Sequence, residues 1–374
     1  MTTETTTPRQ TALHAEHARL GASFTDFGGW DMPLKYGSEL AEHQAVRTAA
    51  GLFDLSHMGE IWVEGREAAR FLNHALVGNM AAMAVGKAKY SLICNADGGI
   101  IDDLITYRRA EDRFLVVPNA GNAPAVAAAL AARVAGFDAT VTDASAETSL
   151  VAVQGPAAEA ILLGLVAAED APRVSGMKYY AADEVAVAGV GTLMARTGYT
   201  GEDGFELYVP NDRAAQLWGA LLEAGRGSGL VPAGLACRDS LRLEAGMPLY
   251  GNELSLEVGP FDAGLGPVVS FKKEEDFVGR AALEAQKAAG PRRVLVGLKG
   301  LGRRAGRSHY PVLRDGAVVG EVTSGQPSPT LGYPVALAYV DAGLAETGTR
   351  LDVDLRGKPE PFEVVALPFY KRQN

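Results

Sequence analysis

Apolar and polar positions up to residue 245 follow two periods, one typical of strands and one typical of helices. Phe205, Leu207 and Val209 fall on one face of an expected strand, and Glu206 shares the other face with Tyr208. Other expected strands cover 100–107, 114–117, 150–153 and parts of 184–209, and the expected helices cover 11–20, 39–50, 67–76, 123–135 and 213–224. This mixed order predicts an α+β fold rather than regular βαβ units.

Local signals set some boundaries of these elements. Gly51 is expected to end the helix over 39–50. Asp212 is a candidate N-cap for the helix over 213–224, because its carboxylate can accept a hydrogen bond from the first turn. The stretch 31–33, which ends in proline, is expected to be irregular.

From Arg293 onward the pattern changes to short strands separated by Gly, Pro or Asp-Gly turns. The expected strands cover 294–298, 310–313, 318–323, 335–340 and 362–367. Such a run predicts a separate C-terminal β domain. The preceding stretch, 246–278, is rich in Gly and Pro and is expected to connect this domain to the rest of the chain.

Length and composition predict a soluble protein of two or three domains. The chain has 374 residues, 47% of them hydrophobic, and no apolar run approaches the roughly 20 residues that a membrane-spanning helix needs. The formal net charge of −10 opposes binding to nucleic acid. Residues 1–10 lack the features of a signal or transit peptide and are expected to form an unstructured tail. Cys94 and Cys237 indicate neither a disulfide nor a zinc site, so a cytoplasmic location is expected.

The sequence signatures of several common kinds of site are missing. Residues 78–87 end in Gly-Lys but lack the spacing of a phosphate-binding loop, and residues 189–194 lack the third glycine of a dinucleotide-binding motif. The six histidines form no HExxH pattern, so no metal site is expected. No GxSxG motif that would hold a hydrolase nucleophile occurs. The sequence therefore favours chemistry by a positioned side chain such as a carboxylate.

Four groups of residues carry a more specific signal. They are 27–36 with Glu42, His43, Arg47 and 51–60; 89–91 with 98–104; 197–206; and 236–246. Together they resemble the T-protein family, the aminomethyltransferases of glycine cleavage, from about residue 11 to the C-terminus. The strings 56–60 and 197–206 are similar to this branch rather than to the demethylases and the iron–sulfur assembly protein of the wider folate-binding superfamily.

This resemblance implies an enzyme that transfers a one-carbon unit from the aminomethyl-dihydrolipoyl arm of a carrier, the H protein, to tetrahydrofolate. The products would be 5,10-methylenetetrahydrofolate and ammonia, with tetrahydrofolate as a co-substrate and no metal. The implied partners are the lipoylated H protein and the other components of the glycine cleavage system.

The resemblance also implies a three-domain ring around a central folate cleft, closed on one side by an antiparallel β-barrel-like C-terminal domain. In such a ring the first two domains are interleaved in the sequence. The expected divisions are a first α+β domain in two parts, 1–55 and 145–250, a second α+β domain over 56–144, a connector over 251–290 and the barrel domain over 291–374.

Asp103 is the first candidate for a catalytic residue. Asp102 and Asp103 are neighbours on an expected strand, so their side chains point to opposite faces and only one can enter a given pocket. By itself, an Asp pair after a Gly-Gly turn is more often a solvated surface pair. The resemblance matches Asp103 with the family's catalytic aspartate, which would stabilise a cationic intermediate and orient the attacking nitrogen.

Glu206 and Arg238 are expected to bind the folate. From the pattern alone, Glu206 would be an exposed strand carboxylate, and Arg238 would form an ion pair on a helix surface. The resemblance implies instead that Glu206 holds the pterin ring, whose adjacent donors suit a carboxylate. It also implies that Arg238 binds a carboxylate of the glutamyl tail or a buried partner acid.

Further binding residues are carried over position by position from the resemblance. They are Tyr90, Asn119, Tyr179 and Tyr199 along the folate cleft, with Met58 packed there and Tyr370 at the C-terminal end. Without the resemblance, each would pass for an ordinary core or rim residue. The residues around Tyr370 depart from the family pattern.

Two questions stay open at the level of the sequence. Residues 291–307 hold six Arg or Lys residues and no Asp or Glu, which fits either a solvated face or a docking surface for an acidic carrier protein. The alternatives to aminomethyl transfer are a folate-dependent demethylase that acts on a small methylated donor and a folate-binding module without catalytic activity.

Overall fold

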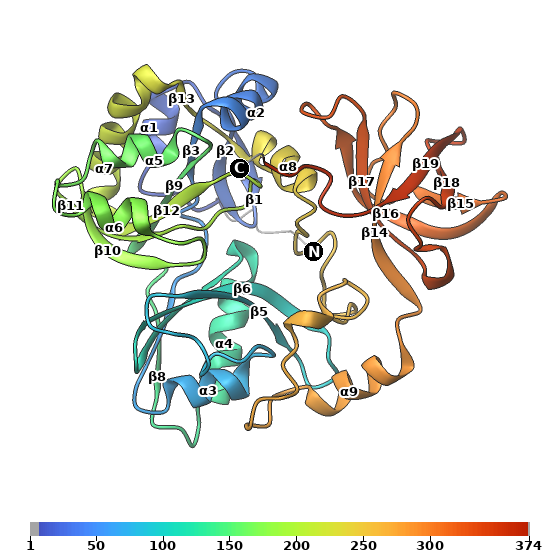
Figure 1. Cartoon of the computed structure of the whole chain (residues 1–374), viewed down its shortest axis with the longest axis horizontal. Coiled ribbons are helices and arrows are strands. Elements are labelled where there is room, and N and C mark those ends of the chain that lie inside the picture. The colour runs from blue at the N-terminus through green and yellow to red at the C-terminus, as the bar shows by residue number, and fades with distance from the viewer. Residues whose placement is uncertain (1–6, 373–374) are drawn as a thin grey trace.

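The computed structural model describes residues 7–372, which form three lobes around a common centre (Figure 1). The first lobe holds a six-stranded sheet, the second a five-stranded sheet and the third a closed barrel. The expected α+β fold with a C-terminal barrel is therefore confirmed. A two-stranded hairpin of β1 (Ser23–Phe27) and β2 (Trp30–Lys35) lies near the centre of the ring.

The sheet of the first lobe takes its strands from two distant stretches of the sequence. Its order is β10 (Ala182–Val187), β11 (Val190–Ala195), β12 (Gly204–Pro210), β9 (Thr148–Gln154), β3 (Ala50–Asp54) and β13 (Leu230–Pro232). The helices of this lobe are α1 (His14–Arg19), α2 (Glu39–Thr48), α5 (Ala158–Leu163), α6 (Ala171–Gly176), α7 (Asn211–Gly225) and α8 (Leu235–Glu244). All neighbouring strands are antiparallel except β3 and β13.

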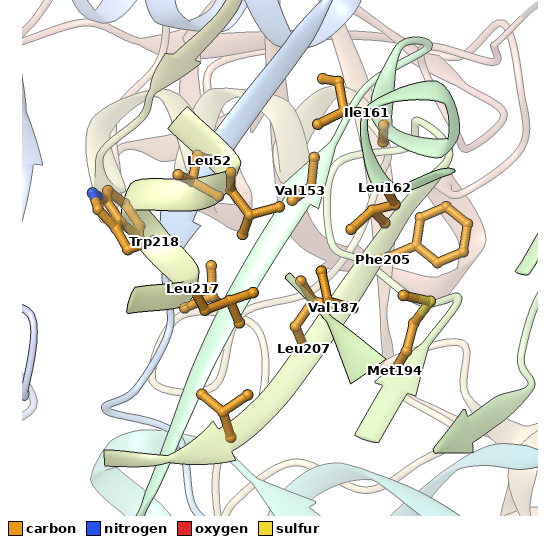
Figure 2. Packing of buried hydrophobic residues seen from close by; sticks show 14 of the residues in the cluster. Leu52, Val153, Ile161, Leu162, Val187, Met194, Phe205, Leu207, Leu217 and Trp218 are labelled. Atoms are coloured by element: carbon orange, nitrogen blue, oxygen red, sulfur yellow. The ribbon is translucent and has the colours of Figure 1, made fainter. Parts of the chain in front are cut away.

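The two faces of this sheet have different partners. On one face, Phe205 and Leu207 of β12 pack with Leu217 and Trp218 of α7 and with side chains of α5 (Figure 2). Burying a side chain such as Phe205 stabilises the fold by about 2–3 kcal/mol. The opposite face carries Tyr208 and packs against α2, α8 and the second sheet. The alternation predicted from the sequence thus separates the core face from the face that carries Glu206.

The second lobe lies against that opposite face. Its sheet has the order β5 (Ala88–Cys94), β6 (Ile100–Ala110), β7 (Arg113–Pro118), β4 (Ile61–Glu64) and β8 (Thr140–Asp143). Its helices are α3 (Ala68–Ala75) and α4 (Ala123–Arg133). Tyr107 and Leu115 of this sheet share an apolar cluster with Phe53 and Ala152 of the first sheet. The two sheets therefore meet through a common core.

The third lobe is an antiparallel barrel. Its strand order is β14 (Arg293–Gly300), β17 (Pro334–Asp341), β16 (Ala317–Pro327), β15 (Pro311–Arg314), β18 (Arg350–Asp354) and β19 (Pro359–Val365). The chain reaches it from α8 of the first lobe through a long segment that passes beside the second lobe and includes α9 (Arg280–Ala289) (Figure 1). Because the strands of each sheet fall within them, we propose the domain boundaries 1–55 with 145–250, 56–144, 251–290 and 291–374.

A buried cluster of charges joins the barrel to the first lobe. Glu244, at the end of α8, accepts hydrogen bonds from Arg47 at 2.7 Å and from the backbone N–H of Thr330 at 3.0 Å. Arg47 also pairs with Glu202 at 2.9 Å. Burial by itself raises the pKa of Glu244, but hydrogen bonds from His43, Ser328 and Arg47 outweigh it and lower the pKa to about 2. The cluster fixes α2 and α8 against the loop between β16 and β17.

Several expected boundaries were wrong. Gly51 does not end a helix but lies inside β3, where an added Cβ would come within 2.5 Å of Val46. Asp212 does not cap α7, which begins at Asn211. Residues 31–33 are not irregular, because they belong to β2, whose free edge tolerates proline. The strand β18 was not predicted, because charged residues flank its inward-facing positions.

The N-terminal tail is only partly described. Residues 1–6 of the expected unstructured stretch 1–10 lie outside the described residues. For Arg9 the expectation was wrong: its N–H donates to Gly29 at 2.9 Å, and its carbonyl accepts from Asp31 at 2.8 Å. Within residues 7–372, none of the helices is both long and apolar enough to cross a membrane.

Candidate active site

A cavity of about 560 Å³ lies where the two sheets and the connecting segment meet. Its walls come from the β1–β2 turn, the segment after β3, strands β5, β6 and β12, the helix α8 and parts of 246–265. The volume is in the range that holds a small organic ligand. Seven of the expected site residues line it: Met58, Tyr90, Asp103, Asn119, Tyr199, Glu206 and Arg238. Within residues 7–372 the barrel supplies no residue to the cavity lining. The side of the cavity that the barrel was expected to close is instead closed by residues of the stretch 246–265.

Asp103 is held in the cavity wall by hydrogen bonds from two neighbouring strands. Tyr90 on β5 donates its hydroxyl to Oδ2 at 3.0 Å, and Asn119, directly after β7, donates its amide to Oδ1 at 2.8 Å. Of the two adjacent aspartates only Asp103 lines the cavity, while Asp102 is fully buried behind it. Burial raises the pKa of Asp103 above its ordinary value.

Glu206 presents part of its carboxylate to the cavity. Its Oε2 accepts hydrogen bonds from the hydroxyls of Thr197 and Tyr107, the second at 3.3 Å. No hydrogen bond to Oε1 occurs within the described part of the chain, and the residue lines the cavity while being only 8% exposed. One oxygen is therefore fixed by the protein and the other is left for a donor on a ligand.

Arg238 is a cation without a carboxylate partner among residues 7–372. It lies in the first turns of α8, and its guanidinium stacks 4.8 Å from the ring centroid of Tyr199. The hydroxyl of Tyr199 donates to the carbonyl of Pro248, which fixes the ring under the guanidinium. Burial lowers the pKa of Arg238, although it stays charged at neutral pH. The surface ion pair that the pattern alone would suggest does not form among the described residues, and Arg238 lines the cavity, as the resemblance implied.

Tyr179 and Tyr370 lie outside the cavity wall. Tyr179 is 47% exposed and packs edge to face on Tyr180, which lines the cavity instead. Tyr180 has a φ of 60°, and this left-handed turn directs the second tyrosine of the pair inward, which no periodicity could predict. Tyr370 packs under Arg47, whose guanidinium lies 4.0 Å from the ring centroid.

Sequence reasoning missed several residues of the cavity. His57 and Phe27 face each other edge to face on its wall, 5.5 Å between ring centroids. Both belong to the strings that carried the family resemblance, so the signal was present but gave them no role. Met247 and Leu249 supply apolar wall from the start of the Gly- and Pro-rich stretch 246–278, which was expected only to connect and pack between domains.

Comparisons with known proteins give a consistent result. Residues 13–273 match the GCVT N-terminal domain, and residues 293–371 match the glycine cleavage T-protein C-terminal barrel domain. An aminomethyltransferase of Streptomyces avermitilis is 61% identical over 370 residues, covering 98% of either chain. One from Bacillus subtilis is 44% identical over 365 residues, covering 97% of this chain and 99% of the relative.

The fold comparison agrees with the sequence comparison. The crystal structure of glycine cleavage system aminomethyltransferase T from Bartonella henselae superposes with a TM-score of 0.90 at 39% identity, covering 97% of this chain and 98% of the other. The matched regions include both sheets, the cavity between them and the barrel. The chain therefore belongs to the glycine cleavage T-protein family.

Proposed function

We propose that this chain is the aminomethyltransferase of a glycine cleavage system. It moves a one-carbon unit from the aminomethyl-dihydrolipoyl arm of an H protein to tetrahydrofolate and releases ammonia. The observation that carries the proposal is a cavity in which three charged groups, Asp103, Glu206 and Arg238, face one space between apolar walls.

The reaction needs few groups from the protein. The transferred carbon loses its bonds to sulfur and nitrogen and gains two bonds to nitrogens of the acceptor. The two acceptor N–H protons go to the departing sulfur and to ammonia, so atoms and charge balance. Placement of the reactants and support for a cationic carbon–nitrogen species are the main tasks of such a site.

The cavity residues fit these tasks. Glu206, with one oxygen held by Thr197, is suited to accept hydrogen bonds from the amino-pyrimidinone edge of a pterin. Arg238 has no protein carboxylate to pair with among residues 7–372 and is suited to a carboxylate of the glutamyl tail. Asp103 supplies a negative charge inside a buried site, where electrostatic support is strong.

The lipoyl arm would reach the cavity from a carrier bound at the surface. In the basic stretch 291–307, Arg304 pairs with Glu360 at 3.2 Å, and Arg303 is exposed at the start of the loop after β14. An acidic carrier would be steered toward such a surface. The proposal therefore includes this stretch as part of the H-protein contact.

One assay separates the three functions under consideration. Tetrahydrofolate is supplied first with aminomethylated H protein and then with methylated small molecules, and ammonia and folate products are measured. Ammonia release that depends on the carrier is the expected result. Turnover of a methylated small molecule without carrier would favour a demethylase, and folate binding without turnover on any donor would favour a binding module.

A further inference from the structure

His57 is a buried polar side chain in the cavity wall with no partner in the protein. It is 3% exposed, and within residues 7–372 neither ring nitrogen takes part in a hydrogen bond. Its Nδ1 is completely shielded and unpaired. Because His57 lines the cavity and its Nε2 also makes no hydrogen bond within the described residues, Nε2 is open to a polar partner that arrives with the ligand.

The backbone around His57 holds the ring in place. The N–H of Ser56 donates to Oδ1 of Asp54 at 2.9 Å, and the N–H of Met58 donates to the carbonyl of Leu55 at 2.9 Å. Gly59 follows, and an added Cβ there would come within 2.7 Å of Ala123. The turn that carries His57 is therefore closely packed.

The Asp54 carboxylate behind this turn is anchored as well. Its Oδ2 accepts from His17 at 2.8 Å and from the hydroxyl of Thr11 at 2.6 Å. On the cavity side, the ring of Phe27 packs edge to face against the imidazole at an interplanar angle of 82°. His57 is thus fixed from two sides, and its position does not depend on a flexible loop.

The surroundings keep the imidazole uncharged. Burial, followed by the positive charge of Arg238, lowers the pKa of His57 below its ordinary value, and the negative charge of Asp54 opposes this only in part. A neutral imidazole has one donor and one acceptor nitrogen. Because Arg238 already supplies a charge for a carboxylate, His57 is suited to an uncharged polar group.

We propose that His57 contacts the substrate and that its Nε2 makes a hydrogen bond with an uncharged polar group of the bound folate. Nδ1 is shielded from the cavity by its own surroundings, so Nε2 is the nitrogen available to a ligand. This inference rests on the proposed function, because it takes the folate as the occupant of the cavity. His57 was not among the folate-binding residues expected from the sequence.

Substitutions that keep or remove one nitrogen test this inference. His57→Phe should weaken tetrahydrofolate binding about tenfold, the effect of one hydrogen bond of about 1.4 kcal/mol. His57→Gln, whose amide nitrogen falls near the position of Nε2, should recover most of the affinity, whereas His57→Asn, which reproduces Nδ1, should not. The change should appear in the Kd and KM for tetrahydrofolate more than in kcat. His309→Gln, at an 87% exposed histidine of the barrel, is the matched control.

Two outcomes separate a failure of the His57 contact from a failure of the proposed function. If the wild-type protein does not bind tetrahydrofolate, both are overturned. If the wild type binds it and a folded His57→Phe protein binds it equally well, only the role of His57 is overturned. Should the Phe variant fail to fold, nitrogen NMR of the wild type gives the answer, because the ring nitrogen signals of His57 must shift when tetrahydrofolate is added, and unchanged signals would refute the contact.

Discussion

The side-chain amide of Asn119 donates to Oδ1 of Asp103 at 2.8 Å, and the same nitrogen lies 2.9 Å from Oδ1 of Asp102. One amide therefore supports two adjacent carboxylates that point into different surroundings. The backbone N–H of Asn119 and the amide of Asn122 complete the contacts of Asp102, at 2.8 and 2.7 Å. The protein therefore supplies hydrogen bonds to both carboxylate oxygens of Asp102, whereas the carboxylate of Asp103 also faces the cavity.

Replacing the Asp103 carboxylate with an amide should separate chemistry from binding. Asp103→Asn keeps the shape but removes the negative charge, so we expect turnover to fall by about 100-fold or more with little change in tetrahydrofolate affinity. Single-turnover rates and calorimetric binding measure the two effects. A large loss of binding or of folding would instead make Asp103 a structural residue.

Removing the amide that supports both carboxylates should shift the pH dependence. Burial holds the pKa of Asp103 above its ordinary value, and the hydrogen bond from Asn119 opposes this rise. In Asn119→Ala the pKa of Asp103 should rise further, so the ionised form should be lost at a higher pH and the acidic limb of the kcat/KM profile should move upward. The comparison is with Asn122→Ala, because within residues 7–372 the side-chain amide of Asn122 donates to Asp102 and not to Asp103. An acidic limb at the wild-type pH would contradict the proposed support.

The free oxygen of Glu206 should matter more for binding than for chemistry. In Glu206→Gln the amide nitrogen can face the ligand's donors, and we expect tetrahydrofolate to bind about 10- to 100-fold more weakly, equivalent to about 1.4–2.7 kcal/mol. Fluorescence titration gives the Kd. Phe205→Leu, on the opposite face of the same strand, should lower stability without a comparable change in Kd.

The cluster around Glu244 should stabilise the fold above acid pH. Its pKa is lowered to about 2, so this contribution is complete above the unfolded value near 4.5 and is lost as the pH falls toward 2. Glu244→Gln should cost on the order of 3 kcal/mol at pH 7 and flatten the acid side of the stability curve. Denaturant unfolding between pH 7 and pH 3 measures this. If the free energy of unfolding changed equally with pH in the wild type and the variant, the cluster around Glu244 would make no pH-dependent contribution to stability.

Substitutions in the basic stretch 291–307 should change the KM for the carrier protein alone. Arg303→Glu with Arg304→Glu should raise the KM for aminomethylated H protein several-fold and reduce its dependence on salt, because exposed charges steer association. Arg314→Glu with Arg350→Glu, elsewhere on the barrel, is the charge-matched control. The same KM in both double variants would remove the stretch from the carrier contact.

The sequence by itself determined which face of several elements is apolar. The alternation over 205–209 places Phe205 in the core and Glu206 on the other face, because the side-chain period of a strand is fixed by its backbone. The change of pattern after Arg293 likewise predicted a separate C-terminal β domain, which the structure shows as a closed barrel. Of the nine site residues that the resemblance implied, seven line the cavity, and six of these seven lie in the four groups that carried the resemblance; their roles in binding and catalysis stay predictions.

Only the tertiary structure decided which elements face one another. The sharing of Asn119 by two aspartates, the inward turn of Tyr180 in place of Tyr179 and the missing partner of His57 all depend on contacts between residues far apart in the sequence. A local period records which side of an element is apolar and carries no information about the element that packs there. The resemblance implied that the barrel closes one side of the cleft, whereas the packing of the stretch after α8 places Met247 and Leu249 in the cavity wall.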